Sequence, residues 1–200
     1  MKILIIGIPR SGTTSLMKGI GKILNLKVIS EPFALHSKEP KLKNFTLPEN
    51  VVVKTMATHL PKDYKGTCIN FNVEFSKKFD HVILLSRANK KEQMESMYNV
   101  IGSDENTSRN LWHSHYTMDK EIPIEQQQIW AETYDRWNNS LQSISTLLKK
   151  PIIWYEKLYS GNKNSVLQCI NELPKGISYD NLKKYIDPKK KYRIYTKVFI

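Results

Sequence analysis

The chain of 200 residues is long enough to bury a complete core around one central sheet. Its apolar fraction of 40% and charged fraction of 25% are ordinary for a globular domain, which excludes the disordered and fibrous classes. No apolar run approaches the roughly 20 residues of a membrane helix, and the apolar start MKILIIGI is too short for a secretory signal. We therefore expect a single cytoplasmic domain spanning residues 1–200, with no membrane span.

The formal net charge of +12 is the one unusual feature of the composition. A nucleic acid, a membrane surface and a polyanionic small ligand all fit such an excess, so the charge alone does not choose between them. Cys68 and Cys169 are too few and too far apart for a disulfide framework or a metal site.

Short apolar runs alternate with stretches of helical periodicity along the chain. The predicted strands cover residues 2–7, 26–30, 51–55, 81–86 and 151–155. The predicted helices cover residues 13–26, 73–79, 90–100 and 124–148. This alternation predicts an α/β fold with three layers, α/β/α, around a central, mostly parallel sheet of about five strands. We interpret residues 102–123, which lack strong periodicity, as a substrate-binding lid.

In a parallel sheet of this kind, ligands bind beyond the carboxyl ends of the strands. That rule selects the residues directly after each predicted strand. These are residues 7–14, Glu31, residues 54–59, Arg87 and Tyr155.

The stretch GIPRSGTTSL forms a P-loop-like strand-loop-helix at the first of these positions. Gly7 and Gly12 have the spacing of a nucleotide-triphosphatase loop, but Thr13 stands where that loop has its lysine. Backbone N–H groups and the helix N-terminus can still bind a terminal phosphate or sulfate. The third and fourth strands end in Lys54 and Arg87 rather than in a magnesium-binding aspartate, so a magnesium-dependent triphosphatase is disfavoured.

PRSGTTSL resembles the P-[KR]-S-G-[ST]-[ST] loop of sulfotransferases that use 3′-phosphoadenosine 5′-phosphosulfate (PAPS). The resemblance implies that Arg10 contacts the bridging oxygen on which charge develops. An arginine at this place is similar to the carbohydrate-type members, since cytosolic members have lysine. The residues implied to grip the 5′-phosphosulfate are Pro9, Arg10, Ser11, Gly12, Thr13, Thr14 and Ser15.

Three further segments extend the resemblance. HVILLSRANKKEQMESM looks like the family's second motif, which implies that Arg87 and Ser96 bind the 3′-phosphate, with the intervening glutamine of some bacterial glycolipid-type members. PIIWYEKLYS is similar to the family's V-R-Y-E-D-L segment, which implies that Tyr155 borders the adenine. PKKKYR, residues 188–193, falls where members carry a basic C-terminal loop.

Two residues are candidates for the general base that takes the proton of the acceptor. Glu31 in SEPF resembles the glutamate of the carbohydrate-type members, and His59 in KTMATHLP resembles the histidine of the cytosolic ones. We favour Glu31, because the end of a strand holds it near the loop, whereas three extra residues displace His59. Lys54 is a further candidate for positive charge near the sulfuryl group.

The resemblance implies a sulfotransferase that moves a sulfuryl group from PAPS to a hydroxyl or, as a second choice, an amine of a small-molecule or carbohydrate acceptor. It needs no metal, and we expect no nucleic-acid partner. Three alternatives stay open: a nucleotide or small-molecule kinase with a degenerate phosphate loop, a member that binds PAPS without activity, and a nucleic-acid-binding protein that uses its basic surface.

Overall fold

A computed structural model of the protein describes residues 1–34, 41–101 and 124–186. The predicted lid at 102–123 and the predicted basic segment at 188–193 lie outside these ranges. The strands are β1 (Lys2–Gly7), β2 (Lys27–Ser30), β3 (Val51–Met56), β4 (His81–Ser86) and β5 (Ile152–Trp154). The helices are α1 (Thr13–Ile23), η1 (Leu42–Asn44), α2 (Cys68–Ser76), α3 (Lys90–Ile101), α4 (Ile124–Leu148), α5 (Tyr155–Leu158), α6 (Lys163–Ile170) and α7 (Tyr179–Leu182).

The five strands form one sheet in the order β2-β3-β1-β4-β5, and every pair is parallel. After β1 the chain crosses to β2, on one side of the sheet, whereas after β4 it crosses to β5, on the opposite side. The carboxyl ends of β1 and β4, which are neighbours, therefore form a topological switch point, the place where open α/β sheets bind ligands.

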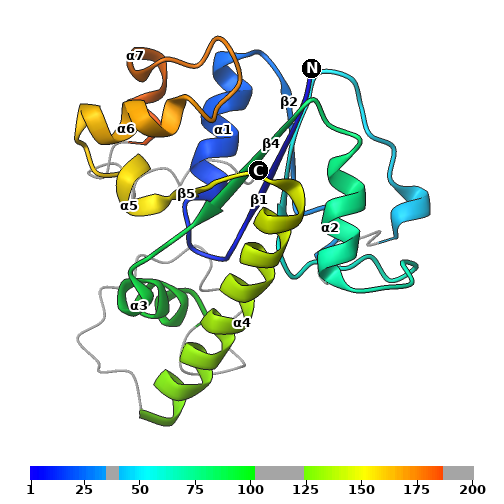
Figure 1. The fold of residues 1–200 in the computed structure, drawn as a ribbon, viewed down its shortest axis with the longest axis vertical. Coiled ribbons are helices and arrows are strands. Elements are labelled where there is room, and N and C mark those ends of the chain that lie inside the picture. The colour runs from blue at the N-terminus through cyan, green and yellow to red at the C-terminus, as the bar shows by residue number, and fades with distance from the viewer. Residues whose placement is uncertain (35–40, 102–123, 187–200) are drawn as a thin grey trace.

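The sheet is buried on both faces, which confirms the predicted three-layer α/β/α fold (Figure 1). Along β1, Ile3 and Ile5 belong to one core cluster, whereas Leu4 and Ile6 belong to the other, as the alternation of side chains along a strand requires. Helices α1, α5, α6 and α7 cover the first face, and α2 and α4 cover the second. Within the described ranges, no helix is both long and apolar enough to cross a lipid bilayer.

The predicted boundaries of two elements are wrong. The helix expected at 73–79 begins at Cys68, because the Thr67 side chain caps it by accepting the N–H of Asn70, and it ends at Ser76. Tyr155 was assigned to the fifth strand, but it is the first residue of α5. A helix of four residues is about one turn long, so the sequence shows no repeat of apolar residues at the helical period of 3.6 that would reveal it.

Phe71, on α2, lies at the centre of an aromatic cluster that fills the second core. Its ring stacks on Phe75 at 5.3 Å between centroids and meets the edges of Phe33 and Tyr64 at 5.1 and 5.4 Å. Because Phe33 follows Glu31 closely in the chain and its ring belongs to this cluster, the cluster anchors the chain segment that leaves the site residue Glu31.

We expect Phe71→Ala to lower the free energy of unfolding by about 3–5 kcal/mol, because it empties a fully buried ring site. Urea unfolding followed by circular dichroism measures this loss. Ile129→Ala, on the exposed side of α4, is the control and should change stability by about 0.5 kcal/mol or less. A loss below 1 kcal/mol for Phe71→Ala would contradict the aromatic core described here.

Candidate active site at the carboxyl edge of the sheet

The turn from β1 to α1 packs so tightly that it requires glycine at both ends. A Cβ on Gly7 would lie 2.4 Å from the Thr13 methyl group and 2.9 Å from the Leu85 carbonyl oxygen. Gly12 has a φ of 81°, and a Cβ there would meet the Tyr159 ring at 2.7 Å. Side chains at either position would push the loop away from β4 and from α5.

The N-terminus of α1 has no side-chain cap, since its N-cap residue is Gly12. The first N–H groups of a helix have no carbonyl partner within the helix, so those at Thr13, Thr14 and Ser15 are available to an anion. The Ser11 hydroxyl is not, because it is buried and donates to the carbonyl oxygens of Ile8 at 2.6 Å and Leu85 at 3.3 Å. Ser11 therefore fixes the loop instead of facing a ligand.

Helix α3 holds the other side of the loop through two of its side chains. The buried Gln93 amide donates to the Pro9 carbonyl oxygen, and the Ser96 hydroxyl accepts from Nε of Arg10 at 2.7 Å. Arg10 also has a φ of 62°, in the left-handed region that few non-glycine residues adopt. The fold thus brings together Arg10 and Ser96, which are 86 positions apart in the sequence.

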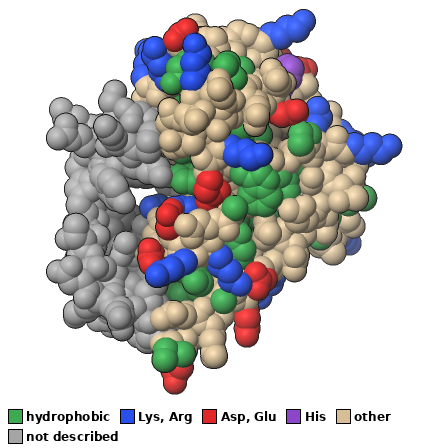
Figure 2. All heavy atoms as spheres, turned by 60° about the vertical axis from the view of Figure 1, so that its left-hand side comes forward, with side chains coloured by type: hydrophobic (Ala, Val, Ile, Leu, Met, Phe, Trp, Pro, Cys, Tyr) green, Lys and Arg blue, Asp and Glu red, His purple; other side chains and the backbone are tan. Residues whose placement is uncertain are grey.

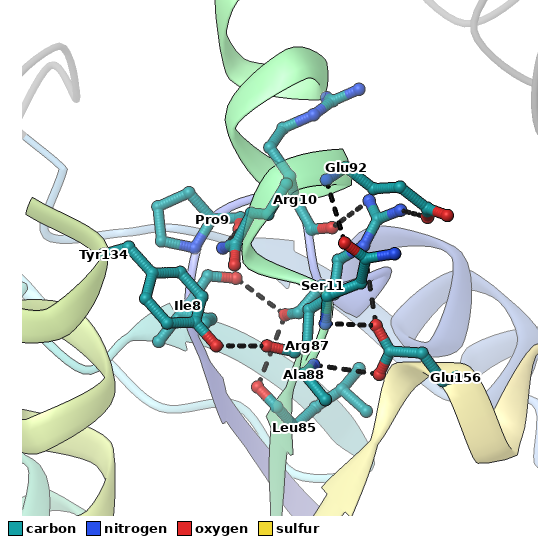
Figure 3. A network of polar contacts seen from close by, with 12 residues as sticks. Ile8, Pro9, Arg10, Ser11, Leu85, Arg87, Ala88, Glu92, Tyr134 and Glu156 are labelled. Atoms are coloured by element: carbon teal, nitrogen blue, oxygen red, sulfur yellow. Dashed lines mark hydrogen bonds and ion pairs between the residues drawn. The ribbon is translucent and has the colours of Figure 1, made fainter. Parts of the chain in front are cut away.

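Arg87, at the end of β4, is the centre of a polar network beside the loop (Figure 3). Its Nη1 donates to the Arg10 carbonyl oxygen at 3.4 Å, and its Nη2 contacts the Glu92 carboxylate. Glu156 Oε1 lies 3.8 Å from Arg87 Nε, while the Tyr134 hydroxyl donates to the Arg87 carbonyl oxygen at 2.7 Å. Burial raises the pKa of the Tyr134 phenol, with a smaller contribution from Glu156, so Tyr134 stays a donor at neutral pH.

Two stacked tyrosines connect this arginine to the phosphate loop. The Arg87 guanidinium lies 4.6 Å from the centroid of the Tyr155 ring, and Tyr155 stacks on Tyr159 at 4.5 Å. The Tyr159 hydroxyl donates to the Gly12 carbonyl oxygen at 2.7 Å. Tyr155, expected from the resemblance to border an adenine, is buried in this stack, and the face of its ring packs against the Arg87 guanidinium.

On the opposite side of the loop, Lys54 of β3 is a buried cation, with 3% of its side chain exposed. Its Nζ donates to Thr14 Oγ1 at 2.9 Å and contacts Oε1 of Glu31. Lys54 and Glu31 meet because Ser30 pairs with Lys54 in the β2–β3 register and the Glu31 N–H donates to the Lys54 carbonyl oxygen at 2.8 Å. The Lys54 ammonium therefore joins the Glu31 carboxylate to the first turn of α1.

The structure brings Glu31 and His59, the two candidates for the general base, into one cluster. His59 Nε2 lies 3.8 Å from Glu31 Oε2. The backbone N–H of Met56 donates to His59 Nδ1 at 3.3 Å, so a neutral ring carries its proton on Nε2, on the side of Glu31. The Glu31 side chain keeps 21% of its surface exposed. Glu31 also has a φ of 51°, a strained conformation typical of functional positions.

The site residues follow the order of the strands along the carboxyl edge of the sheet. Glu31 follows β2, Lys54 lies in β3, residues 8–12 follow β1, Arg87 follows β4, and Glu156 follows β5. Two cationic side chains, Lys54 and Arg87, therefore lie on opposite sides of the loop between β1 and α1. Glu92, Glu156 and Tyr159 are parts of this site that the sequence analysis missed, because their only signal is position beside Arg87 or Gly12.

Charged side chains of both signs are mixed on the face of the molecule shown in Figure 2. The net charge of +12 is therefore not gathered into one uniform basic patch on the described part of this face. At the carboxyl edge of the sheet, the buried cations Lys54 and Arg87 are paired with carboxylates.

Comparison of the sequence with protein-family models finds no match, and comparison with curated proteins finds no significant one.

The Lys54–Glu31 pair predicts a non-additive effect on stability. We expect Glu31→Gln to lower the free energy of unfolding by about 2 kcal/mol, because it leaves a buried ammonium without its carboxylate. Adding Lys54→Met should recover most of that loss, since both charges are then gone. Urea unfolding of the two single variants and the double variant gives the coupling free energy.

The matched control is the surface pair between Lys2 and Glu49, in which the Glu49 side chain is 75% exposed. Glu49→Gln should cost about 0.5 kcal/mol or less. Strictly additive losses at residues 31 and 54 would show that the buried pair does not act as a unit.

Proposed function

We propose that the protein is a sulfotransferase that takes a sulfuryl group from PAPS and transfers it to a hydroxyl or amine of a small-molecule or carbohydrate acceptor. The observation that carries this proposal is the pair of cations on either side of the loop. Lys54 reaches the first turn of α1 through Thr14, and Arg87 reaches the loop backbone through the Arg10 carbonyl oxygen. PAPS has anionic groups at two separate places, a 5′-phosphosulfate and a 3′-phosphate, and so fits this spacing of charge.

The N–H groups of the first turn of α1, with Arg10 and Thr13, are assigned to the 5′-phosphosulfate. Arg87 and Ser96, on the β4 side, are assigned to the 3′-phosphate. Ser96 already accepts a hydrogen bond from Arg10, so the two anion subsites share a contact. When bound, PAPS supplies an activated sulfuryl group, whose transfer leaves adenosine 3′,5′-bisphosphate.

Glu31 is assigned as the general base. Its Oε1 contacts the Lys54 ammonium, and its Oε2 is assigned to accept the proton of the acceptor. The His59 ring is assigned to orient that carboxylate, because Nδ1 is already engaged by the Met56 N–H. Lys54 also contributes positive charge beside the group being transferred.

The principal alternative, a kinase with a degenerate loop, needs magnesium near the loop hydroxyl. In the structure Thr14 Oγ1 accepts a hydrogen bond from the Lys54 ammonium at 2.9 Å. A cation already occupies the place where such a loop binds its metal, which favours a metal-free anion site. The mixed charges of Figure 2 argue in the same way against a nucleic-acid surface on that face.

The proposal predicts which nucleotide the protein binds. Calorimetric titration should show tight binding of adenosine 3′,5′-bisphosphate and much weaker binding of ATP with magnesium and of AMP, because only the bisphosphate carries the 3′-phosphate. Arg87→Ala should weaken bisphosphate binding by about 10- to 100-fold, the cost of losing charge-assisted hydrogen bonds, and leave AMP binding nearly unchanged.

Arg136→Ala, which removes an exposed arginine from α4, is the control for a general loss of charge and should bind the bisphosphate like the wild type. Circular dichroism checks that both variants are folded. Preference for ATP with magnesium would overturn the sulfotransferase proposal in favour of a kinase.

The assignment of the base predicts how two variants differ in turnover. With PAPS and a mixture of sugar and phenol acceptors, release of the bisphosphate product should fall about 10³-fold in Glu31→Gln, the usual effect of losing a general base. His59→Gln should lose about tenfold, since it only orients the carboxylate. Both variants should bind the bisphosphate as the wild type does. A larger loss in His59→Gln than in Glu31→Gln would move the base to His59.

A further inference from the structure

Two carboxylates flank the Arg87 guanidinium, and they are held in different ways. Glu156 accepts the backbone N–H groups of Ala88 at 2.9 Å and Asn89 at 3.0 Å, so both its oxygens are engaged by the turn after β4 (Figure 3). Its distance to Arg87 Nε is 3.8 Å, beyond a hydrogen bond. Glu156 is therefore a fixed part of the turn.

Glu92 is held more loosely. It lies in the first turn of α3, where the Asn89 side chain accepts its backbone N–H at 3.1 Å. Its carboxylate contacts Nη2 of Arg87, and 54% of its side chain is exposed to solvent, against 8% for Arg87. A carboxylate on a half-exposed, rotatable side chain can leave the arginine without any change in the backbone.

The arginine itself has donors to spare within the described part of the chain. Its buried Nε has no hydrogen-bond partner there, and its Nη1 contact with the Arg10 carbonyl oxygen is long, at 3.4 Å. A buried guanidinium that lacks good acceptors is unusual, because leaving such donors unsatisfied costs free energy. The Glu92 carboxylate is thus the strongest acceptor on this guanidinium.

We infer that Glu92 is a built-in competitor for the anion site at Arg87, which a 3′-phosphate must displace in order to bind. This inference rests on the proposed function and adds a specificity-determining residue to it. A phosphate dianion carries more charge and more acceptor oxygens than a carboxylate and therefore displaces it. A ribose hydroxyl or a singly charged anion does not displace the Glu92 carboxylate. Arg87 therefore stays paired with Glu92 unless a nucleotide with a 3′-phosphate binds.

The test is calorimetric titration of the full chain with adenosine 3′,5′-bisphosphate and with AMP. Glu92→Gln should tighten bisphosphate binding about two- to fivefold, the range expected when an ion pair with one exposed partner no longer competes. Binding of AMP should not change, because AMP does not displace Glu92. Glu92→Asp, whose shorter side chain draws the carboxylate back while keeping its charge, should also bind the bisphosphate more tightly than the wild type.

Glu95→Gln is the matched control, since Glu95 is an exposed glutamate on the same helix and the substitution removes the same charge. Equal gains in Glu92→Gln and Glu95→Gln would overturn the inference, because they would show a general field effect. Unchanged or weaker bisphosphate binding in Glu92→Gln and Glu92→Asp would overturn the inference too. The proposed function would still stand in that case, provided that the wild-type protein binds the bisphosphate. Folded wild type and variants that all fail to bind the bisphosphate would overturn both.

Discussion

The tight turn between β1 and α1 is the constraint on which the rest of the site depends. Gly7 lets the loop lie against the backbone of β4, and Gly12 lets it lie against the Tyr159 ring. These two contacts aim the N-terminus of α1 at the edge where the carboxyl ends of five parallel strands meet. Strands β2, β3 and β4 place Glu31, Lys54 and Arg87 relative to that turn, and helix α3 places Ser96.

Charge at this edge is organised in pairs. The buried Lys54 is matched by Glu31, and Arg87 by Glu92 with Glu156 nearby. Burying an unpaired cation is costly, so in the absence of a ligand each cation needs a carboxylate to be stable. The roles proposed above use the same two carboxylates: Glu31 as the general base, and Glu92 as the group that a 3′-phosphate displaces. The two buried cations of the proposed polyanion site, Lys54 and Arg87, are thus each paired with a carboxylate.

The strained backbone conformations support the same interpretation. Arg10, in the turn between β1 and α1, and Glu31, directly after β2, both have positive φ values. Neither residue is a glycine, so each has a steric cost at positive φ. Contacts of the side chains hold both residues in place: Ser96 accepts a hydrogen bond from Arg10, and Lys54 contacts Glu31. Strain of this kind is most simply explained where the direction of a side chain matters more than the stability of its backbone.

The sequence by itself determined the α/β class, the parallel strands, the glycine-dependent loop and the residues that end each strand, because hydrophobic period and strand-end position are local signals. Only the tertiary structure decided how those residues pair. Glu31 and His59 are alternative candidates for the base in the sequence and are neighbours in the fold. Tyr155 is predicted to end the fifth strand, but it begins α5, where its ring packs under the Arg87 guanidinium. Glu92, Glu156 and Tyr159 were missed because contacts between residues far apart in sequence depend on strand order and register, which no local pattern records.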